Sequence, residues 1–353
     1  MNVMRKAIKS VRRRLDLANG RVDLSHGSGG RAMAQLIADI FLAAFDNEWL
    51  RQGNDQAAFD APGGRMVMST DAYVVSPLFF PGGDIGSLAV HGTINDMAMA
   101  GARPLHLSAS FIIEEGFPLA DLDRIAQSMG EASRAADVPV ITGDTKVVER
   151  GKADGLFIST AGVGIAPPGL DLSGNRVQPG DVVILSGTLG DHGVAVMSKR
   201  QNLEFETQIL SDSAALHGLV ADIMAAAGPH LRTMRDPTRG GLAAALNEIA
   251  HQSGLGFRIE EAAIPVKPEV AAACELLGLD PLYVANEGKL IAIVAPAGAA
   301  AALAAMKRHP LGRDAAVIGA AVMDDSRFVQ MVTAFGGGRI VDWLSGEQLP
   351  RIC

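Results

Sequence analysis

Four aspartates in polar segments are the residues of this sequence that point most directly to chemistry. They stand in the segments GNDQAAF, STDAY, TINDMAMAGA and TGDTK, and they are Asp55, Asp71, Asp96 and Asp144. We expect each at a turn or at the end of an element, where each alone is well explained as a cap or turn residue. Together they could hold Mg²⁺, which prefers hard oxygen ligands and neutralises the phosphates of a nucleotide. The prediction of a magnesium and nucleotide site depends on the four as a set.

Glycine-rich segments could offer backbone N–H groups to the same phosphates. Glycines precede expected helices in HGSGG (26–30), in GGDIG (82–86) and at 240–241, and a further turn is expected at Gly143. The N-terminus of a helix binds anions well. A tight turn explains each of these glycines equally well.

The segment RDPTRGG carries cations next to small polar groups. Arg235 and Arg239 flank Asp236 and Thr238, and guanidinium groups suit phosphate. An N-cap by Asp236 or Thr238 is the alternative. Neither G-x-x-x-x-G-K-[ST] nor a strand-linked G-x-G-x-x-G occurs in the sequence, and no closely spaced pair of Cys or His suggests zinc.

The chain ends in the unusual segment LPRIC, which follows four polar residues, 345–348. We expect this tail to leave the folded body, and a tail of about ten residues could carry the thiol of Cys353 about 30 Å when extended. An exposed free thiol is otherwise a liability, so a function for Cys353 is one of two alternatives. Cys274 stands in the apolar segment AAACELLG and is expected to be buried and inert. Two cysteines exclude a disulfide scaffold.

Composition and charge restrict the class of protein. The 353 residues are 48% hydrophobic and 20% charged, which predicts a folded chain of two domains. Residues 1–21 carry seven bases and one acid, so we expect a basic, disordered extension on a body whose net charge is −14. The acidic body argues against nucleic-acid binding. The longest uncharged run, 290–306, is too short for a membrane span, and no signal-peptide core occurs, so we expect a cytoplasmic protein.

Hydrophobic periodicity predicts helices and strands in both halves of the chain. In the first half we expect helices at 31–45, 87–100 and 119–136 and strands at 65–75, 105–113, 138–142 and 156–165. In the second half we expect strands at 181–186, 230–234, 257–260, 290–295, 315–322 and 328–334 and helices at 212–226, 240–252, 268–277 and 299–308. The turn-rich stretch 166–180 marks a boundary. The predicted units are an N-terminal domain (22–165), a C-terminal domain (166–340) and a tail (341–353), with an α+β fold class of two mixed α/β domains.

Seven segments together resemble one known family. They are HGSGGRAM, STDAYVVSPLFFPGGDIG, GTINDMAMAGARP, TGDTKVVERG, RDPTRGGLAAALNE, LGLDPLYVANEGK and LPRIC. In this order they are similar to the hydrogenase maturation factors of the HypE family, from about Val22 to Cys353. More distantly, the chain resembles the aminoimidazole-ribonucleotide synthetase (PurM-like) superfamily, with selenophosphate synthetase and thiamine-monophosphate kinase. The basic extension before Val22 departs from the family pattern.

The resemblance implies an ATP-dependent carbamoyl dehydratase. In the family, the carbamoyltransferase HypF loads a carbamoyl group onto the C-terminal thiol, here Cys353. The thiocarboxamide is then converted to a thiocyanate, and the cyano group passes to iron on a HypC–HypD complex for the [NiFe] hydrogenase centre. The resemblance also implies PurM-like domains that are small sheets covered by helices. Two chains would pair through the N-terminal domain into a barrel-like sheet with ATP sites near the interfaces.

The chemistry of such a dehydration assigns roles to residues independently of the resemblance, with ATP and Mg²⁺ as cofactors. The metal ligands would be the four aspartates Asp55, Asp71, Asp96 and Asp144. ATP would be held by these and by Asn95, Gly143, Thr145, Arg235, Asp236 and Thr238. Cys353 would carry the substrate, Lys146 would orient the carboxamide or the γ-phosphate, and Glu287 would be the base, with His91 a weaker candidate. The alternatives are a solvated charge at a strand end for Lys146 and a turn cap for Glu287.

Two other functions compete with this one. A small-molecule kinase or synthetase of the same superfamily would leave the tail without a role, and LPRIC argues against it. A non-catalytic scaffold would bind a nucleotide and a maturation partner without turnover. In the dehydratase the tail must enter an active site and leave it again, so we expect an inward and an outward position, with ATP favouring the inward one.

Overall fold

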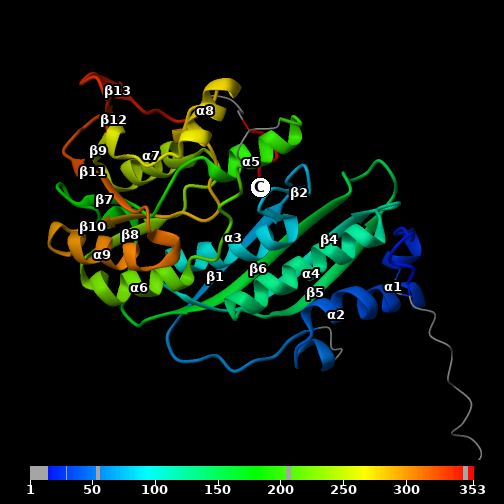
Figure 1. Ribbon diagram of the computed structural model, residues 1–353. Coiled ribbons are helices and arrows are strands. Elements are labelled where there is room, and N and C mark those ends of the chain that lie inside the picture. The colour runs from blue at the N-terminus through cyan, green and yellow to red at the C-terminus, as the bar shows by residue number, and fades with distance from the viewer. Residues whose placement is uncertain (1–14, 29, 53–55, 204–207, 345–348) are drawn as a thin grey trace, which may run out of the picture.

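The computed structural model describes residues 15–28, 30–52, 56–203, 208–344 and 349–353. Its helices and strands form two domains that meet at helix α3 (Ile85–Met99) (Figure 1). Each domain contains a β-sheet and several helices. The prediction of two mixed α and β domains is therefore confirmed.

The N-terminal domain has short helical segments before its sheet and two long helices within it. Its elements are η1 (Leu24–Gly27), α1 (Arg31–Leu36), η2 (Ile37–Phe41), α2 (Leu42–Phe45), η3 (Leu50–Gln52), β1 (Arg65–Tyr73), β2 (Phe79–Phe80), β3 (Gly83–Asp84), α3, β4 (Arg103–Glu114), α4 (Leu119–Ala136), β5 (Val140–Val148) and β6 (Leu156–Ala166). The sheet has the strand order β1-β6-β4-β5, in which β5 runs parallel to β4 and the other neighbours are antiparallel. Strands β1 and β5 are thus its two edges.

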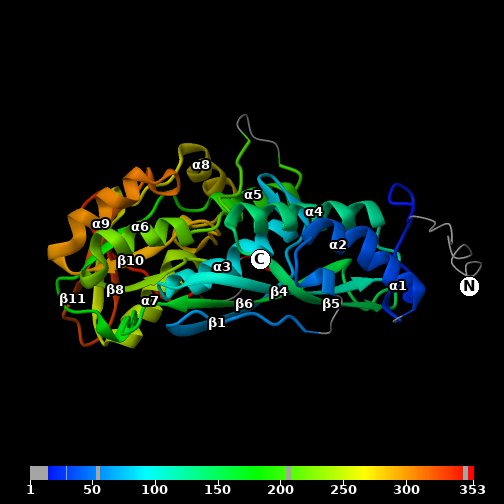
Figure 2. The same ribbon diagram turned by 90° about the horizontal axis from the view of Figure 1, so that it is seen from below.

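The helices of this domain all pack on one face of the sheet, as Figure 2 shows. Helix α4 is amphipathic and buries the side of Leu122, Ile125 and Met129. Helix α3 is buried around nearly its whole circumference, because it packs on β1 and β6, on α4, and on α6 of the other domain. Asp84 caps α3, since its Oδ1 accepts the backbone N–H groups of residues 86 and 87.

The opposite face of the sheet, here called the outer face, carries exposed apolar side chains. Met68 is 73% exposed, and Met66 and Ile112 are also exposed on this face. The pairing of β4 with β5 sets Asp144 opposite Ser110 and Lys146 opposite Ile112, so both charged residues belong to the outer face. No helix in the described part of the chain covers this face.

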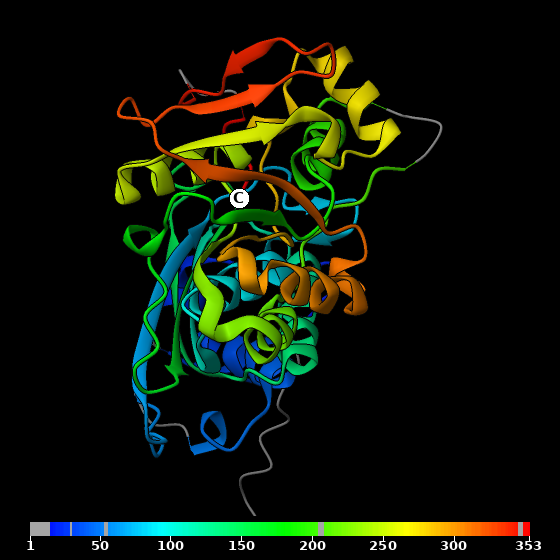
Figure 3. The same ribbon diagram turned by 90° about the vertical axis from the view of Figure 1, so that its left-hand side faces the viewer.

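The C-terminal domain is a seven-stranded sheet with helices on both sides (Figure 3). Its elements are η4 (Gly174–Arg176), β7 (Val182–Leu185), α5 (Asp191–Arg200), α6 (His217–Ala227), η5 (Gly228–His230), β8 (Leu231–Arg235), α7 (Gly241–Ser253), β9 (Gly256–Glu260), η6 (Glu261–Ala263), α8 (Pro268–Leu277), η7 (Pro281–Tyr283), β10 (Ile291–Val294), α9 (Pro296–Arg308), η8 (Pro310–Gly312), β11 (Ala316–Val322), β12 (Val329–Val332) and β13 (Gly338–Ile340).

The strand order of this sheet is β13-β12-β9-β11-β7-β10-β8, and all neighbours are antiparallel except β9 and β12. The interior strand β7 shows why helices cover both faces. Val183 and Leu185 pack with α7, whereas Ile184 between them packs with α6 and α9. Strands buried on both faces read as continuous apolar runs, which is how they were predicted.

Several elements differ from the predicted ones. Helix α5 and strands β2, β3 and β13 were not predicted, and α6 begins at His217 instead of at 212. Strand β5 continues to Val148 instead of ending at 142, so the prediction of a turn at Gly143 is wrong. A glycine is needed inside the strand because a Cβ at this position would lie 2.5 Å from the carbonyl oxygen of Ala109.

The prediction of a disordered extension is wrong for residues 15–21. The backbone N–H of Leu15 donates to Asp39 at 3.1 Å, and that of Leu119 donates to the carbonyl of Gly20 at 3.0 Å. Arg21 bonds to the carbonyl oxygen of Gly116. Residues 1–14 of the predicted extension lie outside the described residues. Within the described residues, no helix combines the length and apolarity that a membrane crossing requires.

The close approach at Gly143 gives a test of the fold. We expect Gly143→Ala to lower the free energy of unfolding by about 1–3 kcal/mol, because the added methyl group would push β5 away from β4. Urea denaturation followed by circular dichroism measures this change. Gly63→Ala is the matched control, since a Cβ at position 63 would have no neighbour within 4 Å. Equal stability of the two variants would contradict the close approach.

Candidate functional site

Four carboxyl groups from both domains meet at the domain junction. Asp71 comes from β1, Asp96 from α3, Asp236 directly follows β8, and Glu287 lies in the turn before β10. Each of the pKa values of Asp96, Asp236 and Glu287 responds to the charge of at least one other member of the group. We call these four residues the acidic cluster.

Hydrogen bonds orient the two members that come from the N-terminal domain. Ser69 donates to one oxygen of Asp96 at 2.6 Å, and the Tyr73 hydroxyl donates to Asp71 at 3.0 Å. Because Ser69, Asp71 and Tyr73 alternate along β1, all three face α3. Hydroxyl groups of β1 therefore orient both carboxyl groups.

A polar cavity of about 340 Å³ opens beside the cluster. Asp96 and the RDPTRGG segment line it, and Arg235 pairs there with Glu248 of α7. Four of the predicted ATP-binding residues, Asp96, Arg235, Asp236 and Thr238, are thus brought together in one cavity. Two arginines at its wall suit an anionic ligand.

Glu287 is the one member of the segment NEGK whose side chain is not used to hold the junction together. Asn286 accepts from the N–H of Gly190 and donates to two carbonyl oxygens, while Lys289 pairs with Asp212 at 2.9 Å. A Cβ on Gly288 would lie 1.8 Å from the carbonyl oxygen of Asp212. Glu287 is buried, and its Oε1 has no hydrogen-bond partner. Its carboxyl group is therefore available to a ligand, and the turn-cap alternative is wrong.

Burial and mutual repulsion keep protons on part of the cluster. Burial raises the pKa of Asp236 to about 7, and Asp96 adds to the rise. Burial also raises the pKa of Glu287 well above its ordinary value, with the charge of Asp236 as the next cause. The pKa of Asp96 is raised by burial as well. Without bound cations, the cluster is thus partly neutral at pH 7.

The C-terminal tail is bound at this junction, so the prediction that it leaves the folded body is wrong for residues 349–353. Figure 1 shows the end of the chain between α5 and β2. Ile352 is 2% exposed, and the thiol of Cys353 lies 3.6 Å from an Nη of Arg239. Burial and, after it, the charge of Glu287 raise the pKa of this thiol to about 12, although Arg239 opposes the rise. The thiol is therefore protonated in the docked tail.

Asp144, Thr145 and Lys146 lie at the other edge of the N-terminal sheet, on β5. Lys146 Nζ is 2.8 Å from Asp144, and both side chains are more than half exposed. This hydrogen bond lowers the pKa of Asp144. The prediction that Asp144 stands at a turn or strand end is wrong, because β5 continues on both sides of it.

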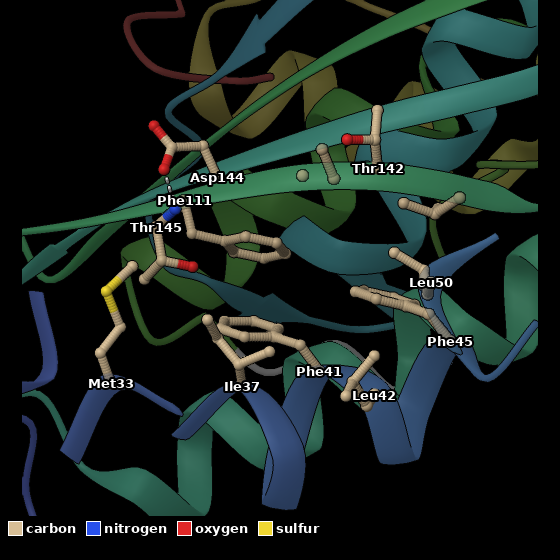
Figure 4. Close-up of a pocket in the computed structure, with 13 residues that line it drawn as sticks. Met33, Ile37, Phe41, Leu42, Phe45, Leu50, Phe111, Thr142, Asp144 and Thr145 are labelled. Carbon is tan, nitrogen blue, oxygen red and sulfur yellow. Dashed lines mark hydrogen bonds between the residues drawn. The ribbon is translucent and has the colours of Figure 1, made fainter. Parts of the chain in front are cut away.

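An apolar pocket of about 120 Å³ lies beside this part of β5 (Figure 4). Phe41, Phe45 and Phe111 point into it from η2, α2 and β4, respectively, and Thr145 faces it from β5. Asp144 lies on the far side of the strand from these rings. The pocket thus offers flat aromatic contacts with polar groups at its edge.

The predicted metal-binding set is not assembled within one chain. Asp71 and Asp144 are on opposite edge strands, with β6 and β4 between them, which separates them by about 14 Å at the usual strand spacing. They also belong to opposite faces of the sheet. Asp55 lies outside the described residues. No three His, Cys, Asp or Glu side chains in the described part of the chain are placed to hold a metal ion.

Asn95 and His91 have structural partners in place of the predicted ligands. The amide of Asn95 donates to the carbonyls of Ala214 and Glu287 and accepts the N–H of Leu216 at 2.7 Å. His91 Nδ1 bonds to the hydroxyl of a serine, Ser213, at 2.9 Å, and burial lowers its pKa to about 4. Both residues therefore join the domains, and the contact of Asn95 with ATP stays a prediction.

Sequence reasoning missed several groups at the junction. Arg239 was noticed in RDPTRGG but was not assigned to the site, although it is the cation that contacts Cys353. Tyr73 and Ser69 were also missed, and their spacing of two from Asp71 on a strand was the available signal. His192 and Arg200 had no signal, because their helix was not predicted.

Comparisons with known proteins agree with this architecture. The family model "AIR synthase related protein, N-terminal domain" matches residues 53–166, and the corresponding C-terminal domain matches residues 178–332. A carbamoyl dehydratase HypE from Rhizobium leguminosarum bv. viciae is 76% identical over 353 residues, with both chains fully covered.

Two solved structures are similar over most of the chain. The crystal structure of hydrogenase maturation protein HypE in complex with ATP has a TM-score of 0.90 and 49% identity, covering 94% of this chain and 99% of that one. A chain of the crystal structure of a HypE–HypF complex has a TM-score of 0.77 and 49% identity, covering 88% of this chain and 99% of that one.

The raised pKa of Asp236 predicts a pH-dependent effect of Asp236→Asn on stability. A carboxyl whose pKa rises from 3.8 to about 7 on folding destabilises the protein as the pH increases between these values. In EDTA we expect the advantage of Asp236→Asn to grow by up to about 1.4 kcal/mol per pH unit across that range and to level off above it. Urea denaturation at pH 5, 6, 7 and 8 measures it.

The exposed Asp222 of α6 offers a matched control. Asp222→Asn should change stability little at any of the four pH values. A constant difference between wild type and Asp236→Asn across the range would show that Asp236 is not protonated by its surroundings.

Proposed function

This chain belongs to the HypE family of AIR synthase related proteins, as its motifs predicted, and we propose that it is an ATP-dependent carbamoyl dehydratase acting on its own C-terminal cysteine. It would convert S-carbamoyl-Cys353 to S-cyanocysteine and so supply the cyanide ligand of the iron in [NiFe] hydrogenase. The observation that carries this proposal is the docked tail, which sets the Cys353 thiol beside Arg239 at the acidic cluster.

The reaction needs ATP because the carboxamide oxygen is a poor leaving group. That oxygen attacks the γ-phosphorus, ADP leaves, and loss of one N–H proton gives an imidate phosphate. Loss of the second N–H proton then expels phosphate and forms the C≡N bond. Thiocarboxamide and ATP thus become thiocyanate, ADP and hydrogen phosphate, with one proton released. Positioning and charge neutralisation supply most of such catalysis.

Glu287 is the best placed base for the N–H protons. The charge of its carboxyl group raises the pKa of the Cys353 thiol. Its Oε1 has no hydrogen-bond partner and could therefore accept an N–H group of the carboxamide. Its pKa is raised by burial and by Asp236. The positive charge of bound Mg²⁺ would lower that pKa, so Glu287 becomes a base when the metal and the substrates are bound. Arg239, next to the sulfur, would stabilise charge on the transferred phosphoryl group.

Asp71 and Asp96 fit the predicted Mg²⁺. Both are carboxyl groups at the polar cavity or beside it, and their hard oxygen atoms are the ligands that Mg²⁺ prefers. Because two carboxylates are too few ligands, we expect phosphate oxygens and water to complete the coordination. The bound ion would neutralise the phosphates of ATP.

We place the adenine of ATP in the aromatic pocket at β5, next to Asp144 and Lys146. A HypE crystal structure in complex with ATP supports nucleotide binding by this fold. The pocket and the acidic cluster lie at opposite edges of one sheet, so a single chain cannot bring Lys146 to Cys353. A second copy is the simplest source of the missing half.

We propose that this second copy packs on the outer face of the N-terminal sheet. The exposed Met66, Met68 and Ile112 on that face would be buried by a homodimer. Lys146 lies on the same face and could then reach the acidic cluster of the partner. Two such sheets packed together would form the barrel-like dimer that the resemblance implies.

The other partners follow from the same chemistry. The HypE–HypF complex supports HypF as the carbamoyltransferase that loads Cys353. We propose a HypC–HypD complex as the acceptor of the cyano group, and the cytoplasm as the site of the reaction. A kinase of a small metabolite is disfavoured because the docked tail sets its own thiol against the acidic cluster. A pure scaffold is disfavoured by the unpartnered carboxyl of Glu287.

The intact mass of the C-terminal peptide tests the reaction directly. After incubation with HypF, carbamoyl phosphate and MgATP, we expect a carbamoyl adduct on Cys353 that subsequently loses one water. In Glu287→Gln the adduct should form normally, but its dehydration should slow by about 100-fold or more, since a general base contributes 10²–10⁴. Cys353→Ala should show neither step.

Glu275→Gln, an exposed change on α8, is the matched control and should dehydrate at the wild-type rate. ATP consumption that continues unchanged in Cys353→Ala, with no adduct on the wild-type tail, would favour a small-molecule kinase.

Complementation tests the shared active site. Lys146→Met and Cys353→Ala should each be inactive alone, because one lacks the cation and the other lacks the thiol. A mixed dimer should regain dehydration at one of its two sites if Lys146 serves the partner's Cys353. Mass spectrometry of the mixture measures it. Met68→Asp in both chains should weaken pairing in sedimentation and remove the recovery, whereas recovery in monomers would contradict the shared site.

A further inference from the structure

We propose that Arg200 and His192 of helix α5 are positioning residues that latch the C-terminal tail by its main-chain carbonyl groups. We call these two residues the tail latch. Its role in the reaction rests on the proposed function, but its effect on the tail can be measured without any reaction.

Arg200 makes the larger part of the latch. Its guanidinium donates to the carbonyl oxygen of Pro350 at 2.7 Å, to that of Arg351 at 2.8 Å, and to that of Ser76 at 2.7 Å. Ser76 lies beyond the end of β1 in the N-terminal domain, and α5 belongs to the C-terminal domain. One side chain therefore binds the tail and the N-terminal domain at the same time.

His192 makes the other part. It is completely buried, and its Nε2 lies 2.9 Å from the carbonyl oxygen of Ile352. A carbonyl only accepts, so Nε2 carries the proton and Nδ1 accepts from the hydroxyl of Ser211 at 2.8 Å. The ring packs edge-on against Phe80. The donor is thus held in one tautomer and one orientation.

The backbone after β1 completes the set of contacts. The N–H of Val74 donates to the carbonyl of Cys353, and that of Ser76 donates to the carbonyl of Arg351, both at 3.1 Å. These two bonds show that the tail runs alongside residues 74–76 in the opposite direction. Each of the last four carbonyl groups of the chain, 350–353, therefore has a donor.

Two side chains of the tail add contacts that depend on its sequence. Ile352 is buried in the apolar core of the N-terminal domain, and Arg351 pairs with Asp154 and donates to the carbonyl of Val74 at 2.9 Å. None of these contacts involves the sulfur. The latch can therefore hold the tail in the same way whether Cys353 carries a thiol, a carbamoyl group or a cyano group.

We expect the latch to open for loading by HypF, because the docked thiol lies against Arg239 at the domain junction. Weakening the latch should thus have opposite effects on the two steps. Loading from HypF should become faster, since it needs the released tail, and dehydration should become slower, since it needs the docked one. A merely destabilised protein would be slower in both.

The test compares alkylation of Cys353 by iodoacetamide in the full chain, followed by mass spectrometry. Arg200→Met keeps the aliphatic stem and removes the donors. We expect Cys353 to react roughly ten-fold faster in this variant, a ratio that corresponds to about 1.4 kcal/mol. Arg200→Lys should restore part of the protection. Lys199→Met is the matched control, because it removes the same charge from an exposed neighbouring position, and it should react like wild type.

Cys274 reports on the fold in the same experiment, since it is buried in α8. If Arg200→Met exposes Cys274 as well, the variant has unfolded, and Arg200→Lys replaces it, because it keeps the charge but cannot make all three guanidinium contacts. A rate at Cys353 equal to wild type in Arg200→Met or, if it replaces that variant, in Arg200→Lys would overturn the latch. So would a wild-type thiol that reacts as fast as a free LPRIC peptide.

The two half-reactions separate this proposal from the proposed function. Faster carbamoylation with slower loss of water in Arg200→Met supports the latch as a positioning device. Equal slowing of both steps would overturn it. If wild type takes up the carbamoyl group but never loses water, the proposed function fails, and the alkylation rates still decide whether the latch exists.

Discussion

Negative charge is crowded at the domain junction, and most of the site follows from this constraint. The carboxyl groups of Asp71, Asp96, Asp236 and Glu287 interact there with two arginines, one of which is already paired with Glu248. Four carboxyl groups this close together in a buried place cannot all be ionised unless cations bind to them. Without bound cations, some of them keep their protons. Binding of Mg²⁺ and loss of protons from the cluster are therefore thermodynamically linked. A base is created where the ligands bind and only when they bind.

The framework that holds these acids together is built from uncharged groups. The side chain of Asn95 makes hydrogen bonds to three backbone groups of the C-terminal domain, and the side chain of Asn286 makes hydrogen bonds to three other backbone groups. The carboxyl group of Glu287, by contrast, keeps an oxygen without a partner. Amides can satisfy donors and acceptors together without a charge that would have to be compensated. This division leaves the charged groups free for ligands. Helix α3 contributes to both sets, because it carries Asn95 and Asp96.

Sequence patterns predicted what depends on local periodicity and missed what depends on tertiary contacts. Helices 119–136 and 268–277 were placed at their observed bounds, because apolar spacing and caps determine them. Helix α5 was missed because Gly190 and Gly193 resemble a turn. Gly193 is in fact required by packing, since a Cβ there would lie 2.4 Å from Val284. Residues 212–216 were predicted as helix, but bonds from Asn95 and Glu287 hold them outside it.

The motifs in the sequence likewise identified the groups of the site but not their arrangement. RDPTRGG and NEGK are separated by about fifty residues, and only the pairing of β8 with β10 brings them together. Asp71 and Asp144 looked equivalent in the sequence, yet they lie on opposite edges of the sheet. The tail was expected to be free because its last residues follow a polar segment, whereas its carbonyl groups find donors in both domains.

A tethered substrate has to bind weakly enough to leave, and the contacts of the tail satisfy this condition. Six hydrogen bonds between the body and residues 350–353 have a main-chain carbonyl group as acceptor, and they would contribute about 6 kcal/mol at about 1 kcal/mol each. Burial of Ile352 would add about 2 kcal/mol. Ordering residues 349–353 costs about 5–10 kcal/mol. These opposing contributions nearly cancel, so small changes at the sulfur or in the nucleotide site can decide between docked and released tails.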